Sequence, residues 1–340
     1  MTPSTDHSQP VTVAKHGLRY NLSMKKLISL CCLFAIICCS LIGVAEETRH
    51  DAGEAVKAYP RKCSFDHLPN SVQLHAGVIS GSLPADDQAF EELANLGIKT
   101  IISVDGARPD VKAAKRHGLR YVHLPHGYDG VPDQRVMELA KAFRDLGGPI
   151  YIHCHHGKHR SPAAASAACV AGGMIPPSDA RTVLEMAGTD PNYRGLYQSA
   201  DRAKRVPDET LDQLAVEFQE VEQVPAVAQA MVNIEHTHHY LKLIAAAQWK
   251  SPQQHPDLDP AHEALILREH FTELLRSEET QNWPKPILQL LRDSETDAQK
   301  LETELRNGMR PGNLNQISQR ISANCKSCHQ QFRDTPLSEK

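Results

Sequence analysis

The chain has 340 residues, of which 41% are hydrophobic, and this length and composition are enough for a sizeable buried core divided between two domains. Its formal net charge is −4 at pH 7, which argues against a protein that wraps nucleic acid with a general excess of basic residues. Any anion that the protein binds must therefore be bound by a local group of residues.

The first part of the chain has the pattern of a targeting segment. Residues 24–26 (Met-Lys-Lys) precede an apolar run over residues 27–44, and small residues at 43–45 provide a cleavage site. We expect residues 1–23 to be an upstream extension, 24–45 a cleaved signal peptide and 46–69 a linker, so that the mature protein is periplasmic or otherwise exported. An uncleaved membrane anchor is the alternative, because the apolar run approaches the length of a membrane span.

The leader removes four of the nine cysteines from the mature chain, and the remaining five are Cys63, Cys154, Cys169, Cys325 and Cys328. Five scattered cysteines do not form the dense disulfide framework of a small secreted scaffold. We expect Cys169 to be a buried core residue, and the sequence assigns no role to Cys63.

Residues 70–205 alternate short β-rich runs with helical patterns, which favours an α/β domain with a mostly parallel sheet covered on both faces. The expected strands are 77–80, 100–104, 121–124 and 149–153, and the expected helices between them are 86–96, 109–117 and 132–146. A ligand site in such a domain lies beyond the carboxyl ends of the strands. The loop that follows residue 153 is one candidate.

That loop has the sequence IHCHHGKHRS and leads into an Ala-rich helix. The backbone N–H groups of residues 155–160, together with the helix N-terminus, can surround a tetrahedral dianion, and Gly157 permits the tight turn. Arg160 adds a planar guanidinium that can bind two phosphate oxygens. The same positive environment predicts that Cys154 is a thiolate and a nucleophile.

With the residues His153, Cys154, Gly157, Arg160 and Ser161, the chain resembles the protein tyrosine and dual-specificity phosphatases, whose signature is HCxxGxxR(S/T). The resemblance covers roughly residues 70–200. It implies a cysteine-dependent phosphatase in which Cys154 forms a phosphocysteine, Arg160 binds phosphate, and the Ser161 hydroxyl assists departure of the thiolate.

The histidines of the loop raise the alternative of a metal site. A loop that directs its amides inward does not direct imidazoles toward a shared centre, so the phosphate interpretation is favoured. We expect His155, His156, Lys158 and His159 to line the mouth of the pocket and to help bind an anionic substrate. His153 is expected below the loop as a structural residue whose polar atoms are satisfied by hydrogen bonds.

A phosphatase of this kind needs a carboxylic acid to protonate the leaving group. Asp129, which follows the expected strand 121–124, is the first candidate. Its interval to Cys154 is shorter than is usual in the family, so Asp105 and Asp133 remain alternatives, although Asp133 is expected to cap the next helix. Each of these residues could also be a turn former.

After a linker at residues 206–224, residues 225–336 contain almost no β-rich run. Helical patterns over 226–248, 260–277, 284–305 and 314–333, separated by turns that contain Pro or Gly, predict an all-α four-helix bundle. The protein is therefore expected to be multidomain, with an α/β domain followed by a helical one.

The last expected helix contains Cys325-Lys326-Ser327-Cys328-His329, which is the CxxCH pattern of covalent c-type haem attachment. No second CxxC or paired histidine spacing follows that would complete a zinc site. With CKSCHQQFR near the end of a helical domain, residues 222–336 resemble the class II c-type cytochromes, the cytochrome c′ group. This resemblance implies one covalent haem c per chain, with His329 as the proximal iron ligand and Arg333 beside the haem.

In that group the other face of the iron is met by the first bundle helix, through either a methionine or an apolar side chain. Met231 is the candidate sixth ligand, and a methionine at this spacing can equally be a core residue. The bis-histidine alternative rests on the neighbouring His236, His238 and His239, which could instead form a solvated face.

Together these patterns predict an exported phosphatase that hydrolyses phosphomonoesters, fused to a haem domain that senses redox state or a gas or transfers electrons. The partners are expected to be a phosphorylated protein or small molecule and a redox partner or diatomic gas, with no nucleic acid and a homodimer through the bundle. The alternative is an electron-transfer or gas-binding cytochrome whose phosphatase-like module only binds phosphate groups.

Overall fold

A computed structural model describes residues 59–308 and 310–340. The expected upstream extension, the signal peptide and its alternative as an anchor lie outside these residues. Within them, no helix combines the length and the apolar character that crossing a membrane requires.

The first part of the described chain contains a six-stranded sheet with the order β1-β2-β3-β6-β4-β5. The strands are β1 (Arg61–Lys62), β2 (Val72–His75), β3 (Val78–Ser82), β4 (Thr100–Ser103), β5 (Arg120–His123) and β6 (Ile150–Cys154). The four strands that the sequence predicts are all present, and β3, β6, β4 and β5 are parallel. The sheet is therefore mostly parallel, as expected, and β1 and β2 extend one edge in antiparallel fashion.

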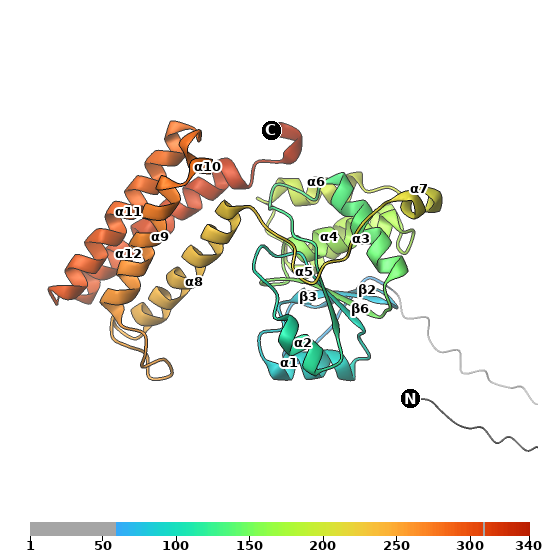
Figure 1. Cartoon of the computed structure of the whole chain (residues 1–340), viewed down its shortest axis with the longest axis horizontal. Helices are drawn as coiled ribbons and strands as arrows, with labels where there is room; N and C mark the ends of the chain where they lie inside the picture. Colours follow the sequence, from blue (N-terminus) through green and yellow to red (C-terminus); the bar gives the residue numbers. More distant parts are fainter. Residues whose placement is uncertain (1–58, 309) are drawn as a thin grey trace, which may run out of the picture. The chain divides into compact units, whose positions relative to one another are not determined.

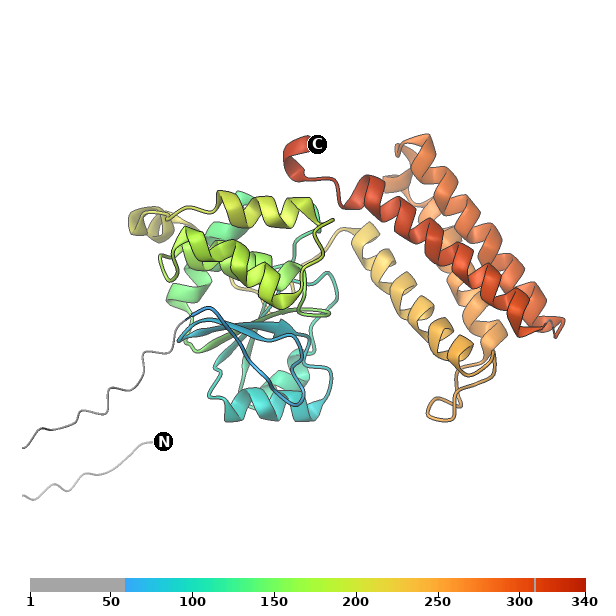
Figure 2. The ribbon, with the colours of Figure 1, turned by 180° about the vertical axis from the view of Figure 1, so that it is seen from behind.

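Helices cover both faces of this sheet, as the alternation of strands and helices predicts (Figure 1 and, from behind, Figure 2). Their bounds are α1 (Asp87–Asn95), α2 (Val111–Arg116), α3 (Asp133–Asp145), α4 (Arg160–Ala171), α5 (Pro177–Ala187) and α6 (Arg194–Arg202). Alternate strand residues enter two separate cores. Ile102 and Ile152 pack with α3 to α6, whereas Ile101 and Tyr151 pack with α1 and α2.

Helix α4 is buried along its whole length, and this explains its unusual composition. It packs against β3, β6, α3, α5 and α6 at once, so only small side chains such as those of Ala163–Ala165 fit between these neighbours. Cys169 is fully buried on this helix, which confirms its predicted place in the core.

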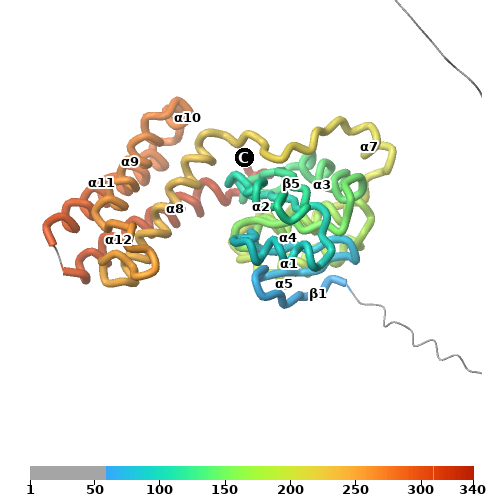
Figure 3. The backbone as a smooth tube through the Cα atoms, turned by 60° about the horizontal axis from the view of Figure 1, so that its bottom comes forward, coloured from blue at the N-terminus to red at the C-terminus, as the bar shows by residue number. Residues whose placement is uncertain are grey.

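A segment after α6 covers the β5 edge of the sheet. It contains the short α7 (Asp208–Gln213), which packs against α3, and then continues into α8 (Ala226–Ala246), as Figure 3 shows. The His123 backbone N–H donates to the Gln219 carbonyl at 2.9 Å, and the Glu222 N–H donates to His123 Nδ1 at 3.1 Å. Covering an edge strand in this way satisfies backbone groups that would otherwise be open to a partner strand.

The remaining residues form a helical bundle whose main helices are α8 (Ala226–Ala246), α9 (Pro260–Arg276), α11 (Lys285–Arg306) and α12 (Pro311–Cys328). These helices agree with the four predicted ones, and a short α10 (Glu278–Gln281) follows α9. After α12 come a π-helical turn η1 (His329–Arg333) and a short η2 (Leu337–Glu339). The bundle has its own core, which includes Leu241, Leu267, Phe271, Leu301 and Ile321.

The four helices do not pack equally. Closely packed pairs are α8 with α9, α9 with α11, and α11 with α12, whereas α8 and α12 pack less closely against each other than any of these pairs in the described residues. A hydrogen bond of 3.1 Å between His238 Nε2 and Ser322 Oγ joins α8 to α12. The described residues 59–308 and 310–340 belong to one compact unit.

Candidate active site

Cys154 is the last residue of β6 and lies at the carboxyl end of the parallel strands, where the α/β prediction places a ligand site. The residue is buried, with 3% of its surface exposed. Ser161 Oγ lies 3.4 Å from Cys154 Sγ and 3.1 Å from the Gly81 carbonyl, so its hydroxyl can donate to either atom. The strand and the first turn of α4 thus bring a thiol and a hydroxyl together.

Gly157 turns the loop between β6 and α4 with a φ of +70°. A Cβ atom added at this position would lie 2.5 Å from the backbone of Gly81 and of Ser82. The loop therefore passes directly over the end of β3, and only glycine allows both this φ and this approach.

Arg160, the first residue of α4, has its guanidinium held from two sides. One Nη atom lies 3.0 Å from Asp105 Oδ2, and the guanidinium carbon lies 4.3 Å from the centre of the Tyr128 ring. Arg160 Nε is buried and has no hydrogen-bond partner among the described residues. A buried N–H without a partner is costly, so this atom is suited to donate to an oxygen of a bound anion.

Asp105 is the buried partner of Arg160 and lies two residues after the end of β4. Burial alone would raise the pKa of its carboxyl, but the Arg160 charge and the Ala107 N–H outweigh burial and lower the pKa to about 2. A group that is ionised throughout the neutral range is poorly suited to donate a proton to a leaving group. The geometry therefore assigns Asp105 to holding Arg160 and disfavours it as the acid.

Asp129 lies on the loop between β5 and α3, as the sequence predicts. This loop is seated on α6, because the Val131 N–H donates to Ser199 Oγ at 2.8 Å and the Asp129 carbonyl approaches Gly195 too closely for any side chain there. The Asp129 carboxylate accepts a hydrogen bond from Lys340 Nζ at 2.7 Å. Asp133 is the first residue of α3 but makes no capping hydrogen bond, so its expected capping role is wrong.

The histidines of the loop differ in exposure. His155 and His156 are exposed and their ring centres lie 4.4 Å apart, while Lys158 is also exposed. His159 is half-buried, with its ring centre 4.5 Å from that of Tyr193, and burial lowers its pKa to about 4. In residues 59–308 and 310–340 no group of three His, Cys, Asp or Glu side chains is arranged to hold a metal ion.

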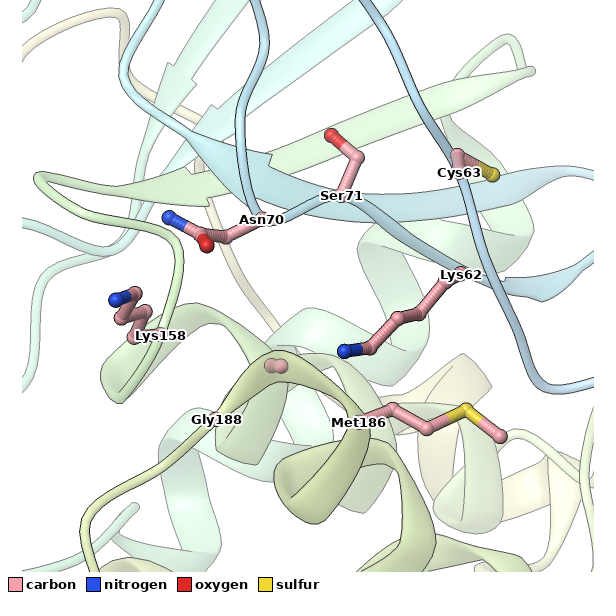
Figure 4. A pocket seen from close by; sticks show the side chains of 8 residues that line it. Lys62, Cys63, Asn70, Ser71, Lys158, Met186 and Gly188 are labelled. Carbon is pink, nitrogen blue, oxygen red and sulfur yellow. The ribbon is translucent and has the colours of Figure 1, made fainter.

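Lys158 also lines a cavity of about 360 Å³ beside the loop, shown in Figure 4. Lys62 and Asn70, from the β1–β2 edge, lie on one side of this cavity, and Gly188, after α5, lies on another. Asn70 Nδ2 donates to the His156 carbonyl at 2.9 Å, so the antiparallel edge of the sheet supports the outer side of the loop. Cys63 also lines the cavity as a free thiol.

His153 lies fully buried below the loop, as predicted, with its Nε2 hydrogen-bonded to the Tyr121 hydroxyl. Its Nδ1 has no partner among the described residues, so the prediction that all its polar atoms are satisfied is wrong. Burial lowers the pKa of the ring to about 4, and His153 is therefore neutral near pH 7.

Sequence reasoning did not identify Tyr128 and Tyr193 as site residues. Their ring centres lie 5.2 Å apart, and Tyr128 covers the Arg160 guanidinium. Tyr128 directly precedes the candidate acid Asp129, and this position in the sequence could have indicated Tyr128 as a site residue. Tyr193 lies beyond α5 in the chain and carries no comparable signal.

The residues of the CxxCH motif lie at the end of α12 and in the turn that follows it. Cys325 and Cys328 are free thiols that face the bundle core, and Met231 of α8 packs against the same core. Of the three histidines on α8, His238 is buried and bonded to Ser322, whereas His236 and His239 are exposed. The structure places Arg333 with its guanidinium carbon 4.1 Å from the centre of the Tyr128 ring.

No protein-family model matches the chain, and no curated protein matches it. Among solved structures the chain is similar to TpbA of P. aeruginosa, with 19% identity, 45% of this chain and 93% of that chain covered, and a TM-score of 0.37. It is also similar to the core catalytic domain of the PP-IP phosphatase SIW14 of S. cerevisiae, in complex with citrate, with 15% identity, coverage of 44% and 93%, and a TM-score of 0.38.

Proposed function

We propose that the protein is a phosphatase that hydrolyses phosphomonoesters through a phosphocysteine on Cys154. The observation that carries this proposal is the grouping at the end of β6, where Cys154 Sγ lies beside the Ser161 hydroxyl and the unpartnered Nε of Arg160 is buried in the same loop. A nucleophile next to a fixed guanidinium is the arrangement that phosphoryl transfer requires. The candidate substrates include proteins that carry phosphotyrosine and proteins that carry phosphoserine or phosphothreonine.

In the first step of this mechanism the Cys154 thiolate attacks phosphorus, the bond to the ester oxygen breaks, and Asp129 as a carboxylic acid protonates the departing oxygen. Arg160 binds two of the equatorial oxygens while Asp105 fixes its orientation. In the second step Asp129 accepts a proton from water, the water oxygen attacks phosphorus, and the sulfur leaves as a thiolate. The Ser161 hydroxyl donates to that sulfur and favours its departure.

Hydrolysis of a chromogenic aryl phosphate by the full chain tests this proposal. Turnover that is abolished in Cys154→Ser supports it, because this variant lacks the nucleophile. Slower turnover of phenyl phosphate in Asp129→Asn supports the acid, because this variant cannot protonate a poor leaving group. The matched control is Cys169→Ser, which changes a buried cysteine on α4 outside the site. Equal turnover in wild type and Cys154→Ser would contradict the mechanism.

We further propose that α12 carries a covalent haem c and that the protein is exported, since such haem attachment takes place outside the cytoplasm. The residues present fit the group. Cys325 and Cys328 are unpaired, half-buried thiols that pack against the bundle core, close enough in sequence for both to react with one group. The two thiols would hold the haem covalently, His329 would ligate its iron, and Met231 faces the same core from α8.

When bound, such a haem supplies an iron that can change oxidation state or bind a diatomic gas. A second candidate function follows, in which the protein is a cytochrome whose α/β part only binds phosphorylated groups. The pairing of Asp129 with Lys340 favours it, because that carboxylate is engaged rather than free. Binding of inorganic phosphate without turnover of any phosphoester would support this second candidate.

A further inference from the structure

The last residues of the described chain lie against the loop that carries the candidate acid. We name residues 333–340 the tail segment. The Leu337 N–H donates to the Asp129 carbonyl at 2.9 Å, and Lys340 Nζ forms an ion pair with Asp129 Oδ2 at 2.7 Å. Both the backbone and the side chain of Asp129 are therefore engaged by the same segment.

Helix α6 anchors the tail segment independently of Asp129. Arg194 forms a two-point ion pair with Glu339, at 2.8 and 3.0 Å, and Ser338 Oγ donates to Gln198 Oε1 at 2.8 Å. Because α6 also supports the Asp129 loop through Ser199, the loop is held between α6 and the tail segment. This arrangement restricts how far the Asp129 side chain can move.

Arg333, the first residue of the tail segment, contacts the same aromatic ring as Arg160, that of Tyr128. The guanidinium carbons of Arg333 and Arg160 lie 4.1 and 4.3 Å from the centre of the Tyr128 ring. Each contact is a cation–π interaction, so the position of Tyr128 depends on both arginines. Arg333 also closes the π-helical turn that begins at His329, which makes it the direct continuation of the CxxCH helix.

These contacts have a chemical consequence for the mechanism. A general acid must present an O–H group to the leaving oxygen, whereas the Asp129 oxygen bound by the Lys340 ammonium is an acceptor. We propose that the tail segment is an autoinhibitory element that withholds Asp129 from proton transfer, and this inference rests on the proposed phosphatase function. The rate of hydrolysis is then set by the fraction of molecules in which the tail segment is displaced from Asp129.

The proposal predicts an effect that depends on the leaving group. In Lys340→Met we expect kcat for phenyl phosphate, a poor leaving group, to rise about threefold, and in the double variant with Glu339→Gln about tenfold, because single exposed ion pairs contribute little. For an aryl phosphate with a strongly acidic phenol, kcat should change less than about twofold, since departure then needs little protonation. Lys300→Met, an exposed lysine of α11, is the matched control and should leave both rates unchanged.

Adding Asp129→Asn to the double variant should remove the gain with phenyl phosphate, because the tail segment acts through that carboxylate. A gain that persists in the triple variant, equal gains with both substrates, or no gain would overturn the proposal.

A second measurement separates failure of this inference from failure of the proposed function. Backbone hydrogen exchange of residues 127–131 should be faster in the Lys340→Met, Glu339→Gln variant than in wild type, whether or not the protein turns over a phosphoester. Unchanged exchange would overturn the contact itself. Absence of turnover in wild type together with faster exchange would contradict the phosphatase and reduce the tail segment to a structural contact.

Discussion

The buried ion pair between Asp105 and Arg160 orients a side chain of the candidate active site. Both side chains are about nine-tenths buried, and the pair fixes a guanidinium whose Nε remains unpartnered. In a buried pair, removing one partner leaves the other charge uncompensated. The orientation of Arg160 should therefore depend on Asp105 even though that carboxylate does not contact the reacting atoms in the proposed mechanism.

We expect Asp105→Asn to lower kcat/KM for an aryl phosphate by about tenfold or more, which corresponds to about 1.4 kcal/mol of transition-state stabilisation. The affinity for inorganic phosphate, measured by calorimetry, should fall by a similar factor because Arg160 loses its fixed orientation. Asp86→Asn is the matched control, since asparagine can still cap α1 by accepting from the Ala89 N–H. Unchanged phosphate affinity in Asp105→Asn would contradict the positioning role.

At Gly157 two effects on the free energy of unfolding can be separated, namely the close approach of the loop to the β3 backbone and the positive φ. Gly157→Ala should destabilise the fold by about 2 kcal/mol or more and abolish turnover, because its Cβ would meet the β3 backbone at 2.5 Å. Gly97→Ala is matched, since Gly97 has a φ of +78° and no atom within 4 Å of an added Cβ. Urea unfolding of both variants should show the larger loss for Gly157, and equal losses would indicate that only backbone strain matters.

At the residue scale, the sequence predicted the order Cys154, Gly157, Arg160 and Ser161 and their place after a strand, because these residues are consecutive in one loop. It left Asp129, Asp105 and Asp133 as candidates for the general acid, and Asp105 and Asp129 differ most clearly in the structure. Their difference arises from tertiary contacts, since Asp105 meets the Arg160 charge whereas Asp129 meets Lys340 from the far end of the chain. No local pattern encodes such pairings.

At the scale of elements, the parallel strands and main helices followed from hydrophobic runs bounded by turns, but β1 and β2 did not. β1 has two residues, both exposed, and β2 alternates buried and half-buried positions over only four residues. Segments this short carry no distinguishable periodicity, and their strand conformation depends on pairing with β3.

Burial of His153 near the end of β6 makes the stability of the fold depend on pH. Burial lowers the pKa of this ring to about 4, whereas an exposed histidine in the unfolded chain has a pKa near 6.5. Between these values the unfolded chain binds more protons, so stability is complete above about pH 6.5 and is lost as pH falls toward 4.

We therefore expect the free energy of unfolding to fall by about 2 kcal/mol between pH 7 and pH 4.5 on account of His153. Urea unfolding at both pH values measures this change, and His153→Gln should show a smaller difference than wild type. His155→Gln, at an exposed position, is the matched control and should behave as wild type. An equal loss in His153→Gln would assign the pH dependence to other groups.

At the scale of the whole molecule, two segments at the ends of the bundle contact the α/β part: the segment before α8 contacts the end of β5, and the tail segment after α12 contacts the loop that carries Asp129. His123 accepts from the Glu222 N–H and donates to the Asp105 carbonyl at 2.7 Å, so the segment entering α8 contacts the strand end that carries Asp105. The tail segment that leaves α12 contacts Asp129. Both connections adjoin a carboxylate of the candidate site.

Haem attachment should depend on α12 thiols alone. When the full chain is made in a host that exports it and attaches c-type haem, we expect haem to remain on the denatured protein, and Cys325→Ala with Cys328→Ala to remove it. Cys63→Ala is the matched control, because Cys63 is also a free thiol but lies at the sheet edge. Haem that is retained by the double variant after denaturation would contradict attachment at CxxCH.

If α12 carries the proposed haem, a second iron ligand would come from the side of α8 that faces the bundle core. Met231 packs there, while His238 already bonds to Ser322 and His236 and His239 are exposed. We therefore expect a low-spin ferrous spectrum in wild type that becomes high-spin in Met231→Ala, because alanine cannot ligate iron. His236→Ala, a change at an exposed position of the same helix, should keep the wild-type spectrum. A high-spin spectrum already present in wild type would instead make Met231 a core residue and leave the iron open to a diatomic gas.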